Sequence, residues 1–250
     1  MLRTLRAALR TVVLTPLFLI HTMRISAKVN RIGKRDRNSP QIEAIAQEWA
    51  RRFIQIPPIT LTVEGLEHVD PGARYIVVSN HRSNFDIPVV VRAMPFPTRF
   101  ISKQEVSKIP IFGKAAVTAG VVMIDRQTAR AGHQALNRAV VESFELGYPI
   151  LLFAEGTRSR TGEMGRFQRG AARIAIATGT DILPIVIAGT SDVSPPGSAI
   201  IYPGEVTVRI LPPVDLTAAT KQDVASITDD LRLLIGSTFE DMTAEQQHQS

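Results

Sequence analysis

The stretch that decides the fold is YIVVSNHRSNFDIP, residues 75–88. Its first five residues are mostly apolar and β-branched, which predicts a buried strand over 75–79. A short polar turn follows, and Asp86-Ile87-Pro88 has the composition of a helix start. A strand that passes through a turn into a helix is typical of an α/β domain, in which active-site residues gather at the carboxyl ends of strands.

Six further apolar runs of strand type flank this stretch, and helical stretches lie between several of them. The runs are 60–66, 99–102, 121–124, 150–153, 183–187 and 206–210. The helical stretches are 127–146, 168–178 and 221–236. This alternation predicts an α/β fold with a mixed, largely parallel sheet of about seven strands flanked by helices. We expect this domain to span residues 58–240, followed by a polar, frayed tail at 241–250.

The composition limits what a functional site can contain. With 250 residues, 44% apolar and 21% charged, the chain suits one globular domain with a small appendage, and disorder is excluded. The sequence has no cysteine, which excludes a thiol nucleophile, a disulfide framework and cysteine-bound metal. No HExxH motif occurs and the histidines are scattered, so we predict neither a metal site nor a bound cofactor.

The positive charge of the chain lies at its start. Residues 1–52 hold eleven Lys and Arg against three acidic residues, a local charge of +8, so the rest of the chain carries −2. A nucleic-acid-binding domain more often spreads its positive charge over the folded body and interleaves aromatic residues, which are only 6% here. The charge pattern therefore favours a membrane surface as partner and argues against nucleic acid.

The first 57 residues predict two amphipathic helices. In MLRTLRAALRTVVLTPLFLI, residues 1–20, leucines and valines at helical spacing lie beside a stripe of three arginines. The uncharged run 11–23 is shorter than the about 20 residues that span a bilayer. A basic link at 28–38 leads to the second helix, which starts at Ser39-Pro40. We expect monotopic membrane association, on the cytoplasmic face of the cell membrane; a helix packed only on its own domain and a mitochondrial presequence are the alternatives.

His81 and Asp86 are the candidate catalytic residues of the turn after 75–79. The turn between them can bring the Asp86 carboxylate onto the His81 imidazole. A histidine whose Nδ1–H is held by an aspartate keeps Nε2 as a proton acceptor, and the carboxylate stabilises the imidazolium that forms. No protein nucleophile is required if the substrate carries the hydroxyl. The alternative is that Ser83 to Asp86 form an S-x-x-D capping box, in which Asp86 only neutralises a helix start.

A second strand end leads into a glycine-rich loop with four arginines. The strand is 150–153, and the arginines are Arg158, Arg160, Arg166 and Arg169. A helix begins near Gly170, and arginines beside the free N–H groups of a helix start suit a phosphate or carboxylate. For Arg160 and Arg166 a solvated basic loop is the better interpretation. Glu155 either holds an arginine in place or acts as a second acid.

Four ordered blocks across about residues 60–190 carry a family resemblance. They are NHRSNFD at 80–86, ISKQE at 101–105 with IPIFG at 109–113 and GVVMIDR at 120–126, FAEGTRS at 153–159, and LPI at 183–185. This ordered set resembles the 1-acylglycerol-3-phosphate acyltransferases, enzymes that make phosphatidic acid. The chain departs from the family pattern at Gln168, where the family commonly has lysine.

The resemblance implies an O-acyltransferase that moves a fatty acyl group from acyl-CoA or acyl carrier protein to the sn-2 hydroxyl of 1-acylglycerol 3-phosphate. In the family pattern His81 is the general base and Asp86 orients it. The acceptor would be bound by Glu155, Gly156, Thr157 and Arg158, with Lys103 and Arg126 as further phosphate contacts. Two alternatives are an acyltransferase of the same fold acting on lyso-ornithine lipid or another lysophospholipid, and a non-catalytic lipid-binding protein at the membrane.

Overall fold

The computed structural model describes residues 2–124, 138–159 and 163–249. In this part of the chain seven strands form one sheet, in the order β1-β7-β6-β2-β5-β3-β4. The strands are β1 Ile59–Glu64, β2 Tyr75–Ser79, β3 Arg99–Lys103, β4 Val122–Ile124, β5 Ile150–Phe153, β6 Asp181–Ala188 and β7 Gly204–Ile210. Neighbouring strands are parallel except β6 and β7, which are antiparallel. The predicted mixed, largely parallel sheet is confirmed.

Strand β2 lies inside the sheet and is covered on both faces. Tyr75 and Val77 point into the core on one side, and Ile76 and Val78 into the core on the other. Burial of both faces explains why the run is continuously apolar instead of alternating. Both neighbours, β5 and β6, run parallel to β2, so the carboxyl ends of these three strands meet at one edge of the sheet.

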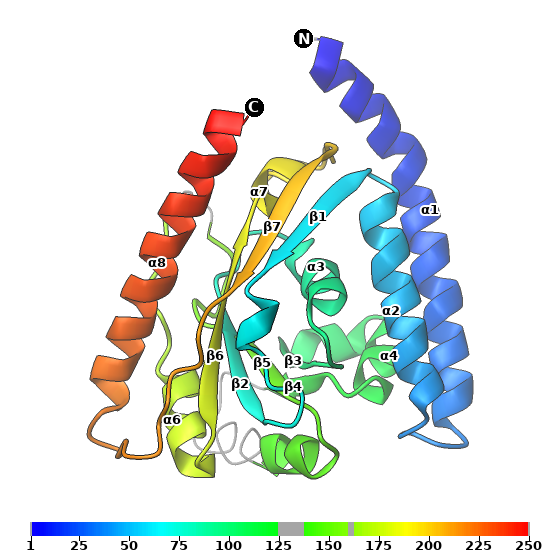
Figure 1. The fold of residues 1–250 in the computed structure, drawn as a ribbon. Coiled ribbons are helices and arrows are strands. Elements are labelled where there is room, and N and C mark those ends of the chain that lie inside the picture. Colours follow the sequence, from blue (N-terminus) through cyan, green and yellow to red (C-terminus); the bar gives the residue numbers. More distant parts are fainter. Residues whose placement is uncertain (1, 125–137, 160–162, 250) are drawn as a thin grey trace.

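Helices cover the two faces of the sheet (Figure 1). On one side lie α1 Leu2–Gly33, α2 Pro40–Gln55 and α3 Asp86–Ala93, with α4 Phe112–Thr118 packed against α1. On the other side lie α6 Gly170–Thr178 and α8 Val224–Gln249. The shorter elements are α7 Thr190–Val193 and the 3₁₀ turns η1 Leu66–His68 and η2 Gln104–Lys108. Of the predicted helix 127–146, residues 138–145 are helical and 127–137 lie outside the described residues.

The N-terminal segment forms two helices, but the first is longer than expected. Helix α1 continues to Gly33, so the link to α2 spans 34–39 and not 28–38. The physical reason is that Val29 is buried against α2 and α4, and lysine and arginine are good helix formers that do not interrupt the helix. By length and composition alone, Thr4–Gly33 is the one helix among the described residues that is apolar enough to cross a membrane.

The C-terminal residues also differ from the expected frayed tail. Helix α8 continues to Gln249, and Met242 is fully buried in the core between α8 and the sheet. Arg209 on β7 forms ion pairs with Glu64 at 2.6 Å and with Glu245 on α8 at 2.7 Å. The polar sequence after residue 240 therefore belongs to the outer face of a packed helix.

Candidate active site

Asn80 fixes the backbone where the chain leaves β2. Its side chain is fully buried and pairs with the backbone of Ile187 on β6, donating from Nδ2 to the carbonyl at 2.8 Å and accepting from the N–H at 2.9 Å. A buried amide that is satisfied on both sides holds one position. The next residue, His81, therefore begins from a fixed point at the carboxyl edge of the sheet.

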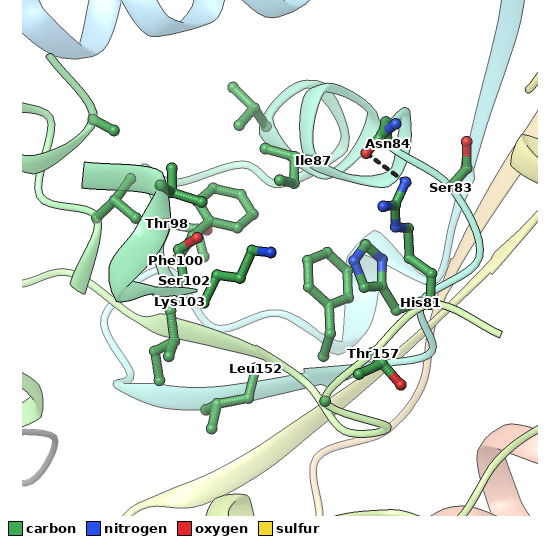
Figure 2. A pocket seen from close by; sticks show the side chains of 18 of the residues that line it. His81, Ser83, Asn84, Ile87, Thr98, Phe100, Ser102, Lys103, Leu152 and Thr157 are labelled. Carbon is green, nitrogen blue, oxygen red and sulfur yellow. Dashed lines mark hydrogen bonds between the residues drawn. The ribbon is translucent and has the colours of Figure 1, made fainter. Parts of the chain in front are cut away.

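The His81 and Asp86 side chains are in direct contact. His81 Nδ1 lies 2.7 Å from Asp86 Oδ2; the Asp86 side chain is fully buried and 16% of the His81 side chain is exposed. A carboxylate at Nδ1 selects the tautomer that carries its proton there, which leaves Nε2 as the basic nitrogen. The imidazole ring stacks on Phe153 of β5, with ring centroids 3.9 Å apart. Figure 2 shows His81 at the wall of a pocket.

Asp86 accepts hydrogen bonds at both carboxylate oxygens. Oδ2 receives the backbone N–H groups of Arg82 at 2.7 Å and Ser83 at 2.8 Å, and Oδ1 receives the Thr190 hydroxyl at 2.6 Å. These donors compensate the loss of water around a buried anion. Asp86 is also the first residue of α3, so one carboxylate both holds His81 and stabilises a helix start. The two interpretations of Asp86 are therefore compatible.

Arg82 supplies a positive charge behind this pair. Its side chain is buried, its guanidinium lies 4.4 Å above the Phe239 ring of α8, and Nη1 donates to the Glu163 carbonyl at 3.2 Å. Burial lowers the pKa of Arg82, while the nearby charges of Glu155 and Asp86 act to raise it. Sequence reasoning missed Arg82, because an arginine in a polar turn is normally solvated.

Glu155 joins the two loops that follow β2 and β5. Its buried carboxylate accepts the His81 backbone N–H at Oε1, 3.0 Å away, and the Gly165 N–H at Oε2, 2.8 Å away. Gly156 follows in the left-handed region at φ +71°, which glycine adopts without strain. Both Glu155 oxygens thus hold backbone groups, and the sharp turn that follows leads the chain to Thr157 and Arg158.

Two of the three predicted phosphate contacts, Lys103 and Arg158, line the same cleft as His81 and come from different parts of the fold. Arg158 is exposed, and its Nη1 donates to Asn84 Oδ1 at 2.7 Å, which ties the loop after β5 to the turn after β2. Figure 2 shows Lys103, from the end of β3, reaching into the pocket across from His81, with Thr157 below the imidazole. Arg126, the remaining predicted contact, lies outside the described residues.

One large cleft, with a volume of about 2150 Å³, is lined by His81, Lys103, Thr157 and Arg158. Its polar part holds His81, Lys103 and Arg158. Apolar side chains of α1, η2, α4 and β3 line the rest, among them Ile25, Val29, Val106, Phe112 and Ile101. Ligand sites for single small molecules are usually about 300–1000 Å³. The cleft therefore has room for two substrates, one of them with a long apolar part.

Comparison with known proteins shows the family to which this chain belongs. Residues 60–188 match the family model described as Acyltransferase. The 1-acyl-sn-glycerol-3-phosphate acyltransferase of Limnanthes douglasii is 30% identical over 194 residues, 78% of this chain and 67% of that protein. This chain belongs to the 1-acyl-sn-glycerol-3-phosphate acyltransferase family. The family resemblance found in the four sequence blocks is confirmed.

In other relatives the aligned region is a smaller share of the relative's own length. The mouse 1-acyl-sn-glycerol-3-phosphate acyltransferase alpha is 30% identical over 75% of this chain and 66% of that protein. The chloroplastic LPAT1 of Arabidopsis thaliana is 37% identical over 68% of this chain and 48% of that protein. The chain thus spans about half to two thirds of these relatives. The crystal structure of the acyltransferase PlsC from Thermotoga maritima has the same fold, with a TM-score of 0.80 at 24% identity over 96% of this chain and 97% of that one.

Proposed function

We propose that this acyltransferase moves a fatty acyl group from acyl-CoA or acyl carrier protein to the sn-2 hydroxyl of 1-acylglycerol 3-phosphate, forming phosphatidic acid. The observation that carries the proposal is the His81 and Asp86 contact at 2.7 Å, at the wall of a cleft that also holds Lys103 and Arg158. A general base beside cationic side chains suits an acceptor that has both a hydroxyl and a phosphate.

The proposed reaction needs no covalent enzyme intermediate. Nε2 of His81 takes the proton of the sn-2 hydroxyl, and the hydroxyl oxygen attacks the thioester carbonyl carbon at the same time. The tetrahedral intermediate collapses with cleavage of the carbon–sulfur bond, and the imidazolium returns the proton to the leaving thiolate. The products are the new ester and a free thiol. Asp86 stabilises the imidazolium in between, as a buried carboxylate at Nδ1 does in catalytic triads.

Arg158 is proposed to bind the acceptor's phosphate. A guanidinium has five N–H donors, and the bond to Asn84 uses one of them while it restrains the side chain beside His81. Charge-assisted hydrogen bonds contribute about 1.5 to 3 kcal/mol, so Arg158→Ala should lower kcat/KM for 1-acylglycerol 3-phosphate by about 10- to 150-fold. Arg158→Lys should recover only part of the loss, because a point charge replaces a planar fork. Steady-state kinetics with varied acceptor checks this.

Two controls test whether the loss in Arg158→Ala is specific to this position and to the acceptor's phosphate. Arg74 is also an exposed arginine, but it precedes β2 at the opposite end from His81, so Arg74→Ala should leave kcat/KM unchanged. With an acceptor that has a free hydroxyl but no phosphomonoester, the loss in Arg158→Ala should be smaller. An equal loss for both acceptors would show that Arg158 supports the loop or the thioester donor and does not bind the phosphate.

We further propose that α1 attaches the protein to the cytoplasmic face of the cell membrane without spanning it. Large apolar residues among the first twenty of the chain are 50% to 72% exposed, namely Leu5, Leu9, Val12, Val13, Leu17, Leu19 and Ile20. An exposed apolar patch of this extent marks an interaction surface. Basic residues along the same segment would attract anionic lipid. A lipid substrate would then meet the cleft at the surface where the protein is held.

A triple substitution tests this attachment better than removal of α1. Phe18 of α1 packs on Phe53 and Phe85, so deletion would open the core. Replacing Leu5, Leu9 and Val12 by serine removes only exposed side chains on one helical face. Burying each such side chain is worth about 1.5 to 3 kcal/mol, so partitioning into anionic vesicles should fall by about 100-fold or more.

Vesicle flotation measures the partitioning directly. Leu233→Ser on α8, where the side chain is 64% exposed, is the matched control and should float like the wild type. High salt should weaken attachment of the wild type without abolishing it, because the apolar face still inserts. If the triple variant floats as well as the wild type, another surface holds the protein at the membrane.

A further inference from the structure

Thr190 contacts the catalytic pair from a distant part of the chain. It is the first residue of α7, separated from the end of β6 by Gly189, and only 1% of the residue is exposed. Its Oγ1 donates to Asp86 Oδ1 at 2.6 Å. The turn before it depends on Gly189, which has φ +90° and where a Cβ atom would lie 2.1 Å from the Glu205 carbonyl oxygen of β7. This turn therefore places Thr190 at a fixed point beside the carboxylate.

The corner between β6 and α7 holds the His81 turn at both of its ends. Ile187 pairs with Asn80, the residue before His81, and Thr190 bonds to Asp86 at the start of α3. The four residues that form these bonds, Asn80, Asp86, Ile187 and Thr190, are all buried. His81 thus lies on a short loop whose two ends are attached to the same rigid corner.

We propose that Thr190 is a positioning residue for the His81 and Asp86 pair, an inference that rests on the proposed transfer reaction. Asp86 Oδ2 already accepts from His81 and from two backbone N–H groups. The Thr190 hydroxyl holds the other oxygen, so the carboxylate cannot rotate about its own axis. Oδ2 then stays in line with Nδ1, and Nε2 stays directed at the acceptor hydroxyl.

The position of Thr190 predicts which kinetic constant depends on it. Thr190 lies behind Asp86 and is not among the residues that line the cleft, so its loss should not weaken binding of either substrate. Its effect should be largest in the transition state, when a proton reaches His81 and the pair becomes an ion pair. Hydrogen bonds to charged groups are the stronger class, so loss of this one should lower kcat by about 10- to 100-fold.

The test compares variants that keep or remove the hydroxyl in the full-length protein. Thr190→Val and Thr190→Ala should lower kcat with KM for donor and acceptor nearly unchanged, and Thr190→Ser should retain most of the activity. Thr228→Val is the matched control, since Thr228 is a buried threonine whose hydroxyl bonds to the Val224 carbonyl within α8. That variant should keep the wild-type kcat. In an Asp86→Asn background, Thr190→Val should cause a smaller loss than in the wild type, because the negative charge through which it acts is already gone.

Three results would overturn the inference. The first is a wild-type kcat in both Thr190→Val and Thr190→Ala. The second is a Thr190→Ser variant as impaired as Thr190→Val. The third is a loss of kcat as large in the Asp86→Asn background as in the wild type. None of these results would contradict the proposed transfer reaction. A wild-type protein that transfers no acyl group would contradict that reaction, but not the hydrogen bond between Thr190 and Asp86.

Discussion

Replacing His81 by alanine should lower kcat by about 10²- to 10⁴-fold with every acceptor that the wild type uses, because general-base catalysis contributes about that much. The substitution removes the only group for which we propose a direct role in proton transfer. His81 stacks on Phe153 at the cleft wall and is partly exposed, so its removal should leave the core and the melting temperature little changed. Thiol release and calorimetry on the same preparation measure both quantities.

Two comparisons separate loss of the base from other effects of His81→Ala. His81→Gln fills a similar space and can hydrogen-bond to Asp86, but it cannot accept a proton at neutral pH, so it should be as inactive as the alanine variant. Membrane attachment should be the same in both variants and in the wild type. A His81→Ala protein with nearly full transfer activity would contradict the catalytic role of His81 and show that another group accepts the proton.

Replacing Asp86 by asparagine should be nearly as harmful, although the geometry can be kept. The amide oxygen can still face His81, while the NH₂ group faces the Thr190 hydroxyl, which can accept in place of donating. What disappears is the negative charge that stabilises the imidazolium. We therefore expect kcat to fall by about 10²- to 10⁴-fold. Stability should fall as well, since the buried Arg82 loses one of the charges that compensate it.

The two possible roles of Asp86 predict different outcomes for this variant. A charge that acts on His81 gives a low kcat, whereas a charge that only caps α3 gives a lower melting temperature with kcat unchanged. Measuring kcat well below the melting temperature of the variant keeps the two effects apart. Full activity in a less stable Asp86→Asn protein would show that the carboxylate serves the helix alone.

The strands could be predicted because their signal is local. Runs such as 75–78 and 150–153 are apolar without interruption and bounded by polar or turn residues, so the sequence itself indicates strands that are buried on both faces. The ends of the chain could not be predicted in this way. Residues 28–33 and 241–249 look polar, and the packing of Val29 and Met242 that holds them in helices is not visible in the sequence.

In the site, too, contacts between residues close in sequence could be predicted, and contacts between distant residues could not. His81 and Asp86 are five residues apart, so a turn was enough to predict their contact, and the structure has it at 2.7 Å. Thr190 lies 104 residues from Asp86, and Asn80 lies 107 residues from Ile187. No spacing rule joins such pairs, because the order of strands in the sheet brings them together. Glu155 shows the same limit, since its partners are backbone N–H groups that no motif displays.

In the proposed reaction the acceptor's sn-2 hydroxyl, deprotonated by His81, attacks the thioester. The most direct measurement follows thiol release from acyl-CoA and from acyl carrier protein, with mass spectrometry of the lipid product, for 1-acylglycerol 3-phosphate and for its analogue with hydrogen in place of the sn-2 hydroxyl. We expect one thiol released per phosphatidic acid formed with the natural acceptor, and neither thiol nor a new lipid with the deoxy analogue. Thiol release that is equally fast with the deoxy analogue, or no phosphatidic acid from either donor, would contradict the proposed reaction.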